Sequence, residues 1–214
     1  MTIVEERLAL LDSLHLGRGS HSSFEDGVCV MEAVAWVAGE PHSDHPKCAS
    51  KLITAFMVSW NDSLRSDEER DRLVRPLVPL LVGTRTTAKD ETTRAWLATD
   101  WLVREQAPAW LRLAGLVEHA HALENLAALT GRKQAVVAQP SIAAADSAAY
   151  AASRTPAYYS AAVSAAYAAA RSAAYYSSAY AAARSAADSA LEPTVTLLQD
   201  SAVLLVKRMC EVGR

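Results

Sequence analysis

The residue types best suited to chemistry gather between positions 29 and 48. Thiols, carboxylates and imidazoles follow one another there: Cys29, Glu32, Glu40, His42, Asp44, His45 and Cys48. The spacing His42-x2-His45-x2-Cys48, joined by Cys29, would give zinc two nitrogen and two sulfur ligands, which is a common tetrahedral set. One interpretation of this stretch is therefore a metal site with zinc as its cofactor.

The two cysteines also support a plainer interpretation. Structural zinc sites usually present cysteines in closely spaced pairs, whereas Cys29 and Cys48 each stand alone in an apolar segment. An isolated buried cysteine packs as a small hydrophobe. We therefore favour a capped loop between two helices, with polar contacts and no cofactor. Under either interpretation the candidate site comprises Glu32, Glu40, His42, Asp44 and His45.

Other patterns in the chain fall short of a known site. The Glu-x2-His pattern at 118–121 has the spacing of di-iron bundles, but the sequence has no second copy, so we interpret it as a solvated helix face. The Gly-Arg-Gly at 17–19 lacks the third glycine and the strand of a dinucleotide-binding loop. Asp100 is expected to form a structural salt bridge with Arg94 or Arg104 at helical spacing.

The elements that position these residues are helices. Apolar residues recur at helical spacing between turn-forming residues, which predicts helices over 4–14, 27–38, 47–64, 66–74, 90–106, 108–116 and 117–129. Gly39 suits the left-handed position after a helix, and Ser66 with Glu69 has the form of a capping box. Since no segment has the pattern of a strand, the sequence predicts an all-α, multi-helix bundle.

A repeat dominates the last part of the chain. The segment 147–160, SAAYAASRTPAYYS, recurs at 164–177, and a degraded third copy follows. Alanine favours helix and glycine is absent from Arg132 to Val212, so we expect helices over 140–154, 156–190 and 193–211. The chain then divides into a helical N-terminal domain at 1–131 and an Ala/Tyr/Ser-rich tract with a closing helix at 132–214, packed on the first part.

The long Ala/Tyr-rich helix offers a face for interaction. Alanines allow a neighbouring backbone to approach closely, and tyrosines add large apolar rings with a polar tip. Such a helix is hard to cover with one layer, so we expect it to pack on the N-terminal part, on another copy of itself, or on both. The tyrosines assigned to this face are Tyr158, Tyr159, Tyr167, Tyr175, Tyr176 and Tyr180.

Composition argues against several classes of function. Charged residues interrupt the apolar tract and the N-terminus has no continuous apolar run, so we expect neither a membrane span nor a signal peptide. A formal net charge of −3 provides no basic surface, so nucleic acid is not expected as a partner. Three widely spaced cysteines do not make a disulfide scaffold, and we expect a cytoplasmic protein.

Several blocks of the sequence resemble a known family. The blocks are CVMEAVAWVAGEPHSDHPKC at 29–48, SWNDSL at 59–64, LVGTRTT at 81–87, RAWLATDWLVREQAPAWLRLAGL at 94–116 and LEPTVTLLQDSAVLLVKRM at 191–209. They are similar to those of an uncharacterised all-helical family of actinobacteria and their phages, which combines them with a variable alanine-rich tract. The resemblance implies a helical architecture and such an origin without supplying an activity, and it points to Glu40–Pro46 with Glu32 as the first place to look for a site.

These observations favour a non-enzymatic interaction or assembly protein, phage-encoded, that binds a second copy of itself or a helix of a host protein. The alternative is a small metal-binding protein or enzyme centred on Glu32, Glu40, His42, Asp44 and His45. A nucleic-acid-binding accessory protein comes third.

Overall fold

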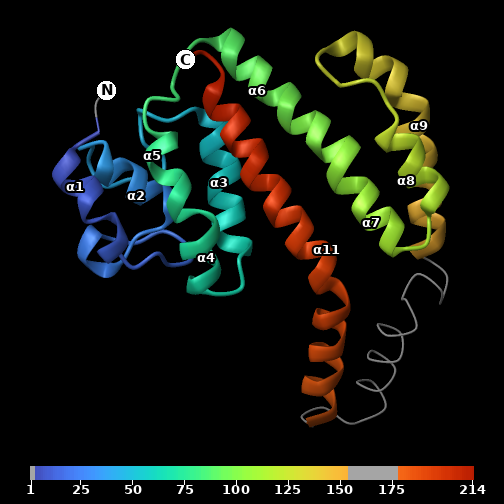
Figure 1. The fold of residues 1–214 in the computed structure, drawn as a ribbon, viewed down its shortest axis with the longest axis horizontal. Helices are drawn as coiled ribbons and strands as arrows, with labels where there is room; N and C mark the ends of the chain where they lie inside the picture. The colour runs from blue at the N-terminus through green and yellow to red at the C-terminus, as the bar shows by residue number, and fades with distance from the viewer. Residues whose placement is uncertain (1–2, 154–177) are drawn as a thin grey trace. The chain divides into compact units, whose positions relative to one another are not determined.

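The computed structural model describes residues 3–153 and 178–214, apart from the side chains of residues 150–190. Within these residues the chain consists of helices and connecting turns, and the β-type pairing is limited to one isolated parallel bridge between Leu16 and Val28 (Figure 1). The predicted all-α, multi-helix fold is thereby confirmed. No helix in the described ranges combines the length and the apolar character needed to cross a bilayer.

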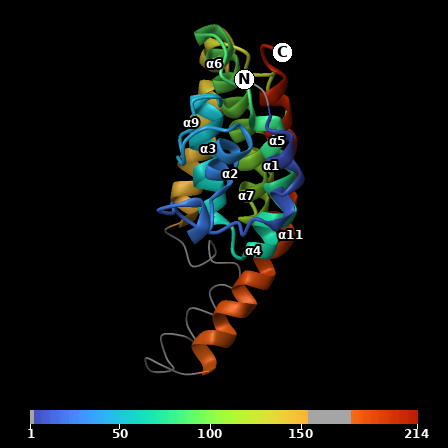
Figure 2. The same ribbon diagram turned by 90° about the vertical axis from the view of Figure 1, so that its left-hand side faces the viewer.

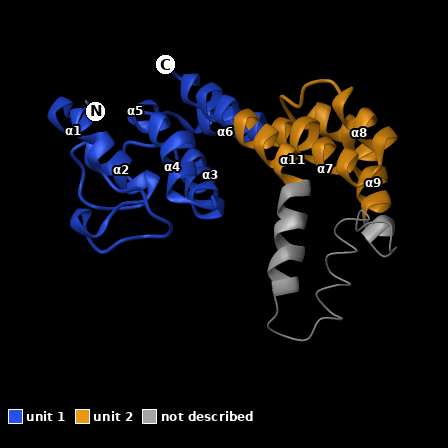
Figure 3. Ribbon diagram, turned by 60° about the horizontal axis from the view of Figure 1, so that its bottom comes forward, with its two compact units in different colours: residues 1–98, 202–214 blue, residues 99–201 orange. Residues whose placement is uncertain are grey.

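The chain forms two compact units (Figure 3). Unit 1 comprises Met1–Ala98 and Ala202–Arg214, and unit 2 comprises Thr99–Ser201. Two helices, α6 (Ala88–Trp101) and α11 (Ser178–Glu211), each belong to both units. This grouping differs from the regions expected at 1–131 and 132–214, because the end of α11 belongs with the N-terminal helices.

Unit 1 is built around α2 (Figure 2). Its other elements are α1 (Glu5–Ala9), α3 (Lys51–Ser63), α4 (Asp67–Leu73), α5 (Val78–Leu81) and the unit 1 parts of α6 and α11. Helix α2 (Val30–Val37) packs against α1, α3 and α5, and all of its residues except Trp36 are buried. An eight-residue helix with so little polar surface is stable only as the centre of a core.

The helix ends follow local chemistry. Gly39 has a φ of 71°, and the Glu40 amide bonds to the Ala35 carbonyl, as in a Schellman motif. The Ser66 hydroxyl accepts the Glu69 amide, which confirms this half of the predicted capping box, while Glu69 Oε2 accepts the Arg65 amide. The predicted start of the next helix at residue 47 was wrong. The Ser50 hydroxyl accepts the Ile53 amide, so α3 begins at Lys51 and the preceding residues form a turn.

A buried arginine fastens the end of α11 within unit 1. The Arg94 side chain is 0% exposed, and its Nε and Nη2 donate to the carbonyls of Met209 and Val212. Its Nη1 donates to the Thr86 hydroxyl and to Glu91 Oε1 at 2.8 Å. Arg94 therefore supplies donors to carbonyl groups at a helix end that lack partners within the helix.

Unit 2 contains an irregular helix followed by a helical hairpin. The last turn of α6 leads into a π-helical turn (Leu102–Gln106), then α7 (Ala107–Leu113), α8 (Val117–Glu124), α9 (Arg132–Ser153) and the first part of α11. Gly115, with a φ of 78°, turns the chain between α7 and α8. The Arg112 guanidinium then bonds both carboxylate oxygens of Glu124 across the hairpin.

Prolines do not end helices where the sequence suggested. We expected a break between 106 and 108, but the helix continues into Pro108 through a π-helical turn, in which the Ala107 amide bonds to the Leu102 carbonyl five residues earlier. Helix α9 starts at Arg132 and contains Pro140, and α11 contains Pro193. Each proline removes a single N–H donor. Ala145 follows Pro140 in α9 and Leu198 follows Pro193 in α11. Both residues are buried and hold their helices on neighbouring elements.

Candidate functional site

Glu32, the centre of the predicted site, is buried inside unit 1 and holds a loop in place. Its Oε1 accepts the His21 amide at 2.9 Å, and its Oε2 accepts the Cys29 amide at 2.7 Å. The His21 ring lies 2.9 Å from Oε2 through Nδ1. In return, the Glu32 amide donates to Cys29 Sγ, which completes a capping box at the start of α2. The carboxylate is thus occupied by donors from the chain itself.

His21 was not identified from the sequence as a site residue, although it follows the Gly-Arg-Gly at 17–19. Its ring lies between two glycines: an added Cβ would come within 2.8 Å of Nε2 at Gly17 and within 3.3 Å of Cδ2 at Gly27. Gly27 also has a φ of 105°, which side-chain-bearing residues rarely adopt. The glycines around the histidine were the signal available in the sequence, because they leave space for a ring against the backbone.

A second buried side chain holds the same loop. The Asn61 amide donates to the Gly17 carbonyl at 3.0 Å and its oxygen accepts the Val30 amide. The Gly19 amide donates to Asp62 Oδ1. Together with the Leu16–Val28 bridge, these bonds fix the loop on α2 and α3. The polar residues of this region therefore act as structural acceptors and donors for backbone groups.

His42 lies close to this arrangement, whereas Glu40 bonds to the backbone at Lys47. The His42 ring packs edge-on against Phe24, and its Nε2 lies 3.8 Å from Glu32 Oε1, beyond hydrogen-bond distance. Glu40 Oε2 accepts the Lys47 amide at 2.6 Å, while Glu40 Oε1 and His42 Nε2 are buried without a hydrogen-bond partner. The structure therefore brings Glu32 and His42 together and adds His21.

The remaining predicted residues do not join them. Asp44 and His45 pair with each other at the surface, with 2.7 Å between Oδ1 and Nδ1. Within the described part of the chain, no group of three or more His, Cys, Asp or Glu side chains is arranged to hold a metal ion. The proposed set Cys29, His42, His45 and Cys48 is therefore not assembled as a ligand cluster in this structure.

All three cysteines are free and buried in unit 1. Burial raises the pKa of the Cys29 thiol to about 12 and the pKa values of Cys48 and Cys210 to about 11. The thiols are therefore protonated at neutral pH, whereas the thiolate is the nucleophilic form.

The other patterns have structural roles. Arg104 bonds both oxygens of Asp100 at 3.2–3.3 Å, which confirms the expected salt bridge, and Asp100 Oδ1 also accepts the Leu129 amide at 2.7 Å. Arg94, the other expected partner, binds Glu91 instead. Both Glu118 and His121 are exposed on α8, as expected for a solvated face.

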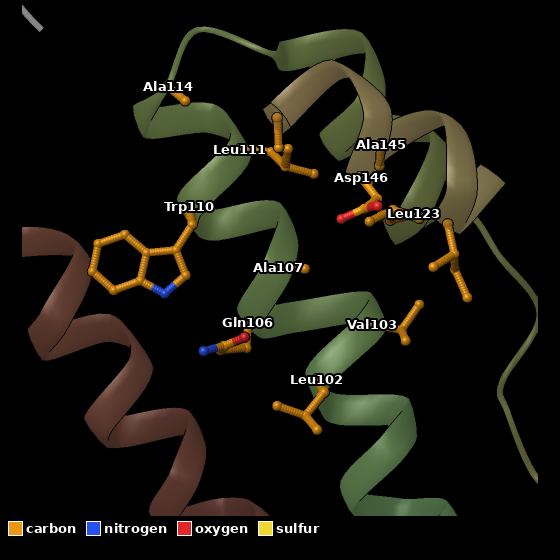
Figure 4. A pocket seen from close by; sticks show the side chains of 12 residues that line it. Leu102, Val103, Gln106, Ala107, Trp110, Leu111, Ala114, Leu123, Ala145 and Asp146 are labelled. Atoms are coloured by element: carbon orange, nitrogen blue, oxygen red, sulfur yellow. The ribbon is translucent and has the colours of Figure 1, made fainter. Parts of the chain in front are cut away.

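Unit 2 carries a groove that the sequence did not reveal (Figure 4). It has a volume of about 380 Å³ and is lined by Leu102, Val103, Gln106, Ala107, Trp110, Leu111, Ala114, Leu123, Ile142, Ala145, Asp146 and Ala149. Most of the lining is apolar, and the polar side chains in it are Gln106 and Asp146. Leu102 and Trp110 are 47% and 36% exposed.

The π-helical turn shapes one wall of this groove. It contributes Leu102, Val103 and Gln106 to the lining, and α7 continues the wall with Trp110 and Leu111. Pro108 has no amide hydrogen, and its ring would crowd the carbonyl four residues earlier in a regular helix. A π-helical turn relieves that crowding, and such turns recur at functional sites. No sequence pattern marked the groove, because it depends on how the π-helical turn, α7, α8 and α9 pack together.

The tyrosine face lies largely outside the described residues. Tyr158, Tyr159, Tyr167, Tyr175 and Tyr176 fall within 154–177, and the side chain of Tyr180 on α11 is not described either. The assignment of these residues to an interaction face stays a prediction.

Comparison of the chain with protein-family models, with curated proteins and with solved structures gives no match.

Proposed function

We propose that this chain is a non-enzymatic helical interaction and assembly protein, and that the groove of unit 2 receives an apolar helix. The observation that carries the proposal is the exposure of Leu102 and Trp110 beside an apolar hollow. Exposed apolar surface of this kind is typical of a binding surface, and grooves between helices are a common site for an amphipathic helix.

The geometry of unit 1 supports the same choice over the enzyme alternative. Glu32 is surrounded by donors from its own chain, Asp44 pairs with His45 at the surface, and the thiols are buried. A general base needs a carboxylate or imidazole within reach of a substrate proton. The candidate site around Glu32 instead satisfies backbone groups of the loop that it holds.

We take a second copy of this chain as the occupant of the groove, and the sequence resemblance makes a helix of a host protein the alternative. Sedimentation velocity of the full chain tests this directly. Self-association at micromolar concentration is expected, and Leu102→Glu and Trp110→Asp should each weaken it because they place a charge in an apolar contact.

Leu10→Glu is the matched control, because Leu10 is 55% exposed in unit 1 and does not line the groove. Its association should equal that of the unmodified chain. A chain that stays monomeric up to about 100 μM, a concentration that detects even weak dimers, would contradict self-assembly. If both groove variants associate as strongly as the unmodified chain, the groove is not the contact surface, and the tyrosines of 154–177 become the next surface to test.

A further inference from the structure

Helix α11 has an apolar stripe that the described residues of the chain leave exposed. Leu197 and Leu204 are 59% and 61% exposed. They are seven residues apart, so they lie on one face of the helix, and Arg208, four residues further on, extends the same face. The adjoining face, about 100° round the helix, is buried through Leu198, Ala202, Leu205 and Met209. The apolar surface of α11 is therefore wider than the part that the described residues bury.

The stripe and the groove match in chemistry and in length. Leu197 and Leu204 offer apolar side chains to an apolar groove, and Arg208 offers a cation to a groove whose charged member is Asp146. Asp200, between the two leucines, can accept the amide hydrogens of Gln106. Residues 197–208 span about 16 Å and the wall from Leu102 to Ala114 about 18 Å at 1.5 Å per residue.

We propose, on the basis of the function proposed above, that the α11 stripe of one copy occupies the unit 2 groove of a second copy. In this dimer Leu197 and Leu204 cover Leu102 and Trp110, and Arg208 pairs with Asp146. Each copy carries both the stripe and the groove, so every copy can both donate a helix and receive one.

A charge exchange tests the pairing in the full chain. Asp146→Arg and Arg208→Asp should each raise the dimer dissociation constant about tenfold or more, because each places like charges opposite one another. The double variant Asp146→Arg with Arg208→Asp should return the dissociation constant to within about threefold of the original, since the pair is restored in reverse. Leu197→Glu should weaken the dimer in the same way, and Leu10→Glu should not.

Both residues of the pair are exposed, so the variants are expected to fold. Far-ultraviolet circular dichroism and the protection of the buried thiols check this. Failure of the double variant to restore association would overturn the pairing of Arg208 with Asp146.

Two further outcomes separate this pairing from the general function. If the groove variants weaken the dimer while Leu197→Glu and Arg208→Asp have no effect, the groove function stands and α11 is not its occupant. If the unmodified chain is a monomer, both proposals fail.

Discussion

Replacement of Arg94 by methionine should destabilise unit 1 more than any surface substitution. Methionine keeps an unbranched side chain of similar reach but removes the donors to the carbonyls of Met209 and Val212, to Thr86 and to Glu91. Breaking a buried ion pair by removing one partner typically costs about 3–5 kcal/mol. The second carboxylate oxygen of Glu91 keeps its bonds from Ser50 Oγ and the Leu52 amide. We therefore expect the lower end, about 3 kcal/mol.

The three thiols make the measurement specific to unit 1. They are all buried there, so their reaction with a disulfide reagent under native conditions reports the opening of this unit. Chemical denaturation followed by thiol reaction gives the free energy of opening for both variants. Arg112→Met is the matched control, because Arg112 forms an exposed salt bridge in unit 2 and should leave the thiols of unit 1 protected.

The free energy of opening of unit 1 in Arg94→Lys should lie between those of Arg94→Met and the unmodified chain. A lysine restores a charge opposite Glu91 but cannot reach two carbonyls and a carboxylate with the fixed fork of a guanidinium. If Arg94→Met and Arg112→Met leave thiol protection equally intact, the end of α11 is held by apolar packing alone, and the reasoning about the arginine network is refuted.

Three other predictions concern the loop and the thiols of unit 1. Glu32→Gln should cost about 2 kcal/mol in denaturant unfolding, because an amide has one acceptor oxygen for the donors that Glu32 now serves; the exposed Glu25→Gln should cost far less, and equal losses would contradict the role assigned to Glu32. Gly27→Ala should lower the free energy of unfolding by about 1–2 kcal/mol, because Gly27 has a φ of 105° and lies against the His21 ring. Gly19→Ala should lose only the part of this free energy that comes from backbone strain, since Gly19 has open space around it. Burial raises the thiol pKa values from 9.0 to about 11–12, so the unfolded chain loses these protons first as pH rises. Their contribution to stability is complete below pH 9 and declines as pH approaches 11, and a flat unfolding free energy across that range would count against it.

The sequence predicted those helix ends and salt bridges whose partners are close together in the chain. Gly39 ends α2, Ser66 caps α4, and Arg104 lies one turn from Asp100. Each depends on residues within about four positions of one another, where the backbone geometry determines which side chains are in contact. The all-α class follows from the same periodicity summed over the chain.

Features that depend on distant contacts were missed. His21 contacts Glu32 because the loop that carries it is held on α3 by the hydrogen bond from Asn61 to the Gly17 carbonyl. The helices continue through Pro140 and Pro193 because packing outweighs the loss of one hydrogen bond at each. Predicting the groove would require the relative positions of α7, α8 and α9.

The distribution of satisfied and exposed groups is what separates the two classes of function. In unit 1 the buried polar side chains Glu32, Asn61 and Arg94 bond to main-chain groups, which is the behaviour of residues that build a fold. In unit 2, Leu102 and Trp110 stay exposed at the groove, and on α11 Leu197 and Leu204 stay exposed as well. Covering Trp110 and Leu197 would contribute about 25 cal/mol per Å² of buried apolar area, which a partner could gain on binding. A partner that covers both surfaces accounts for their exposure, and a catalytic role for Glu32 does not.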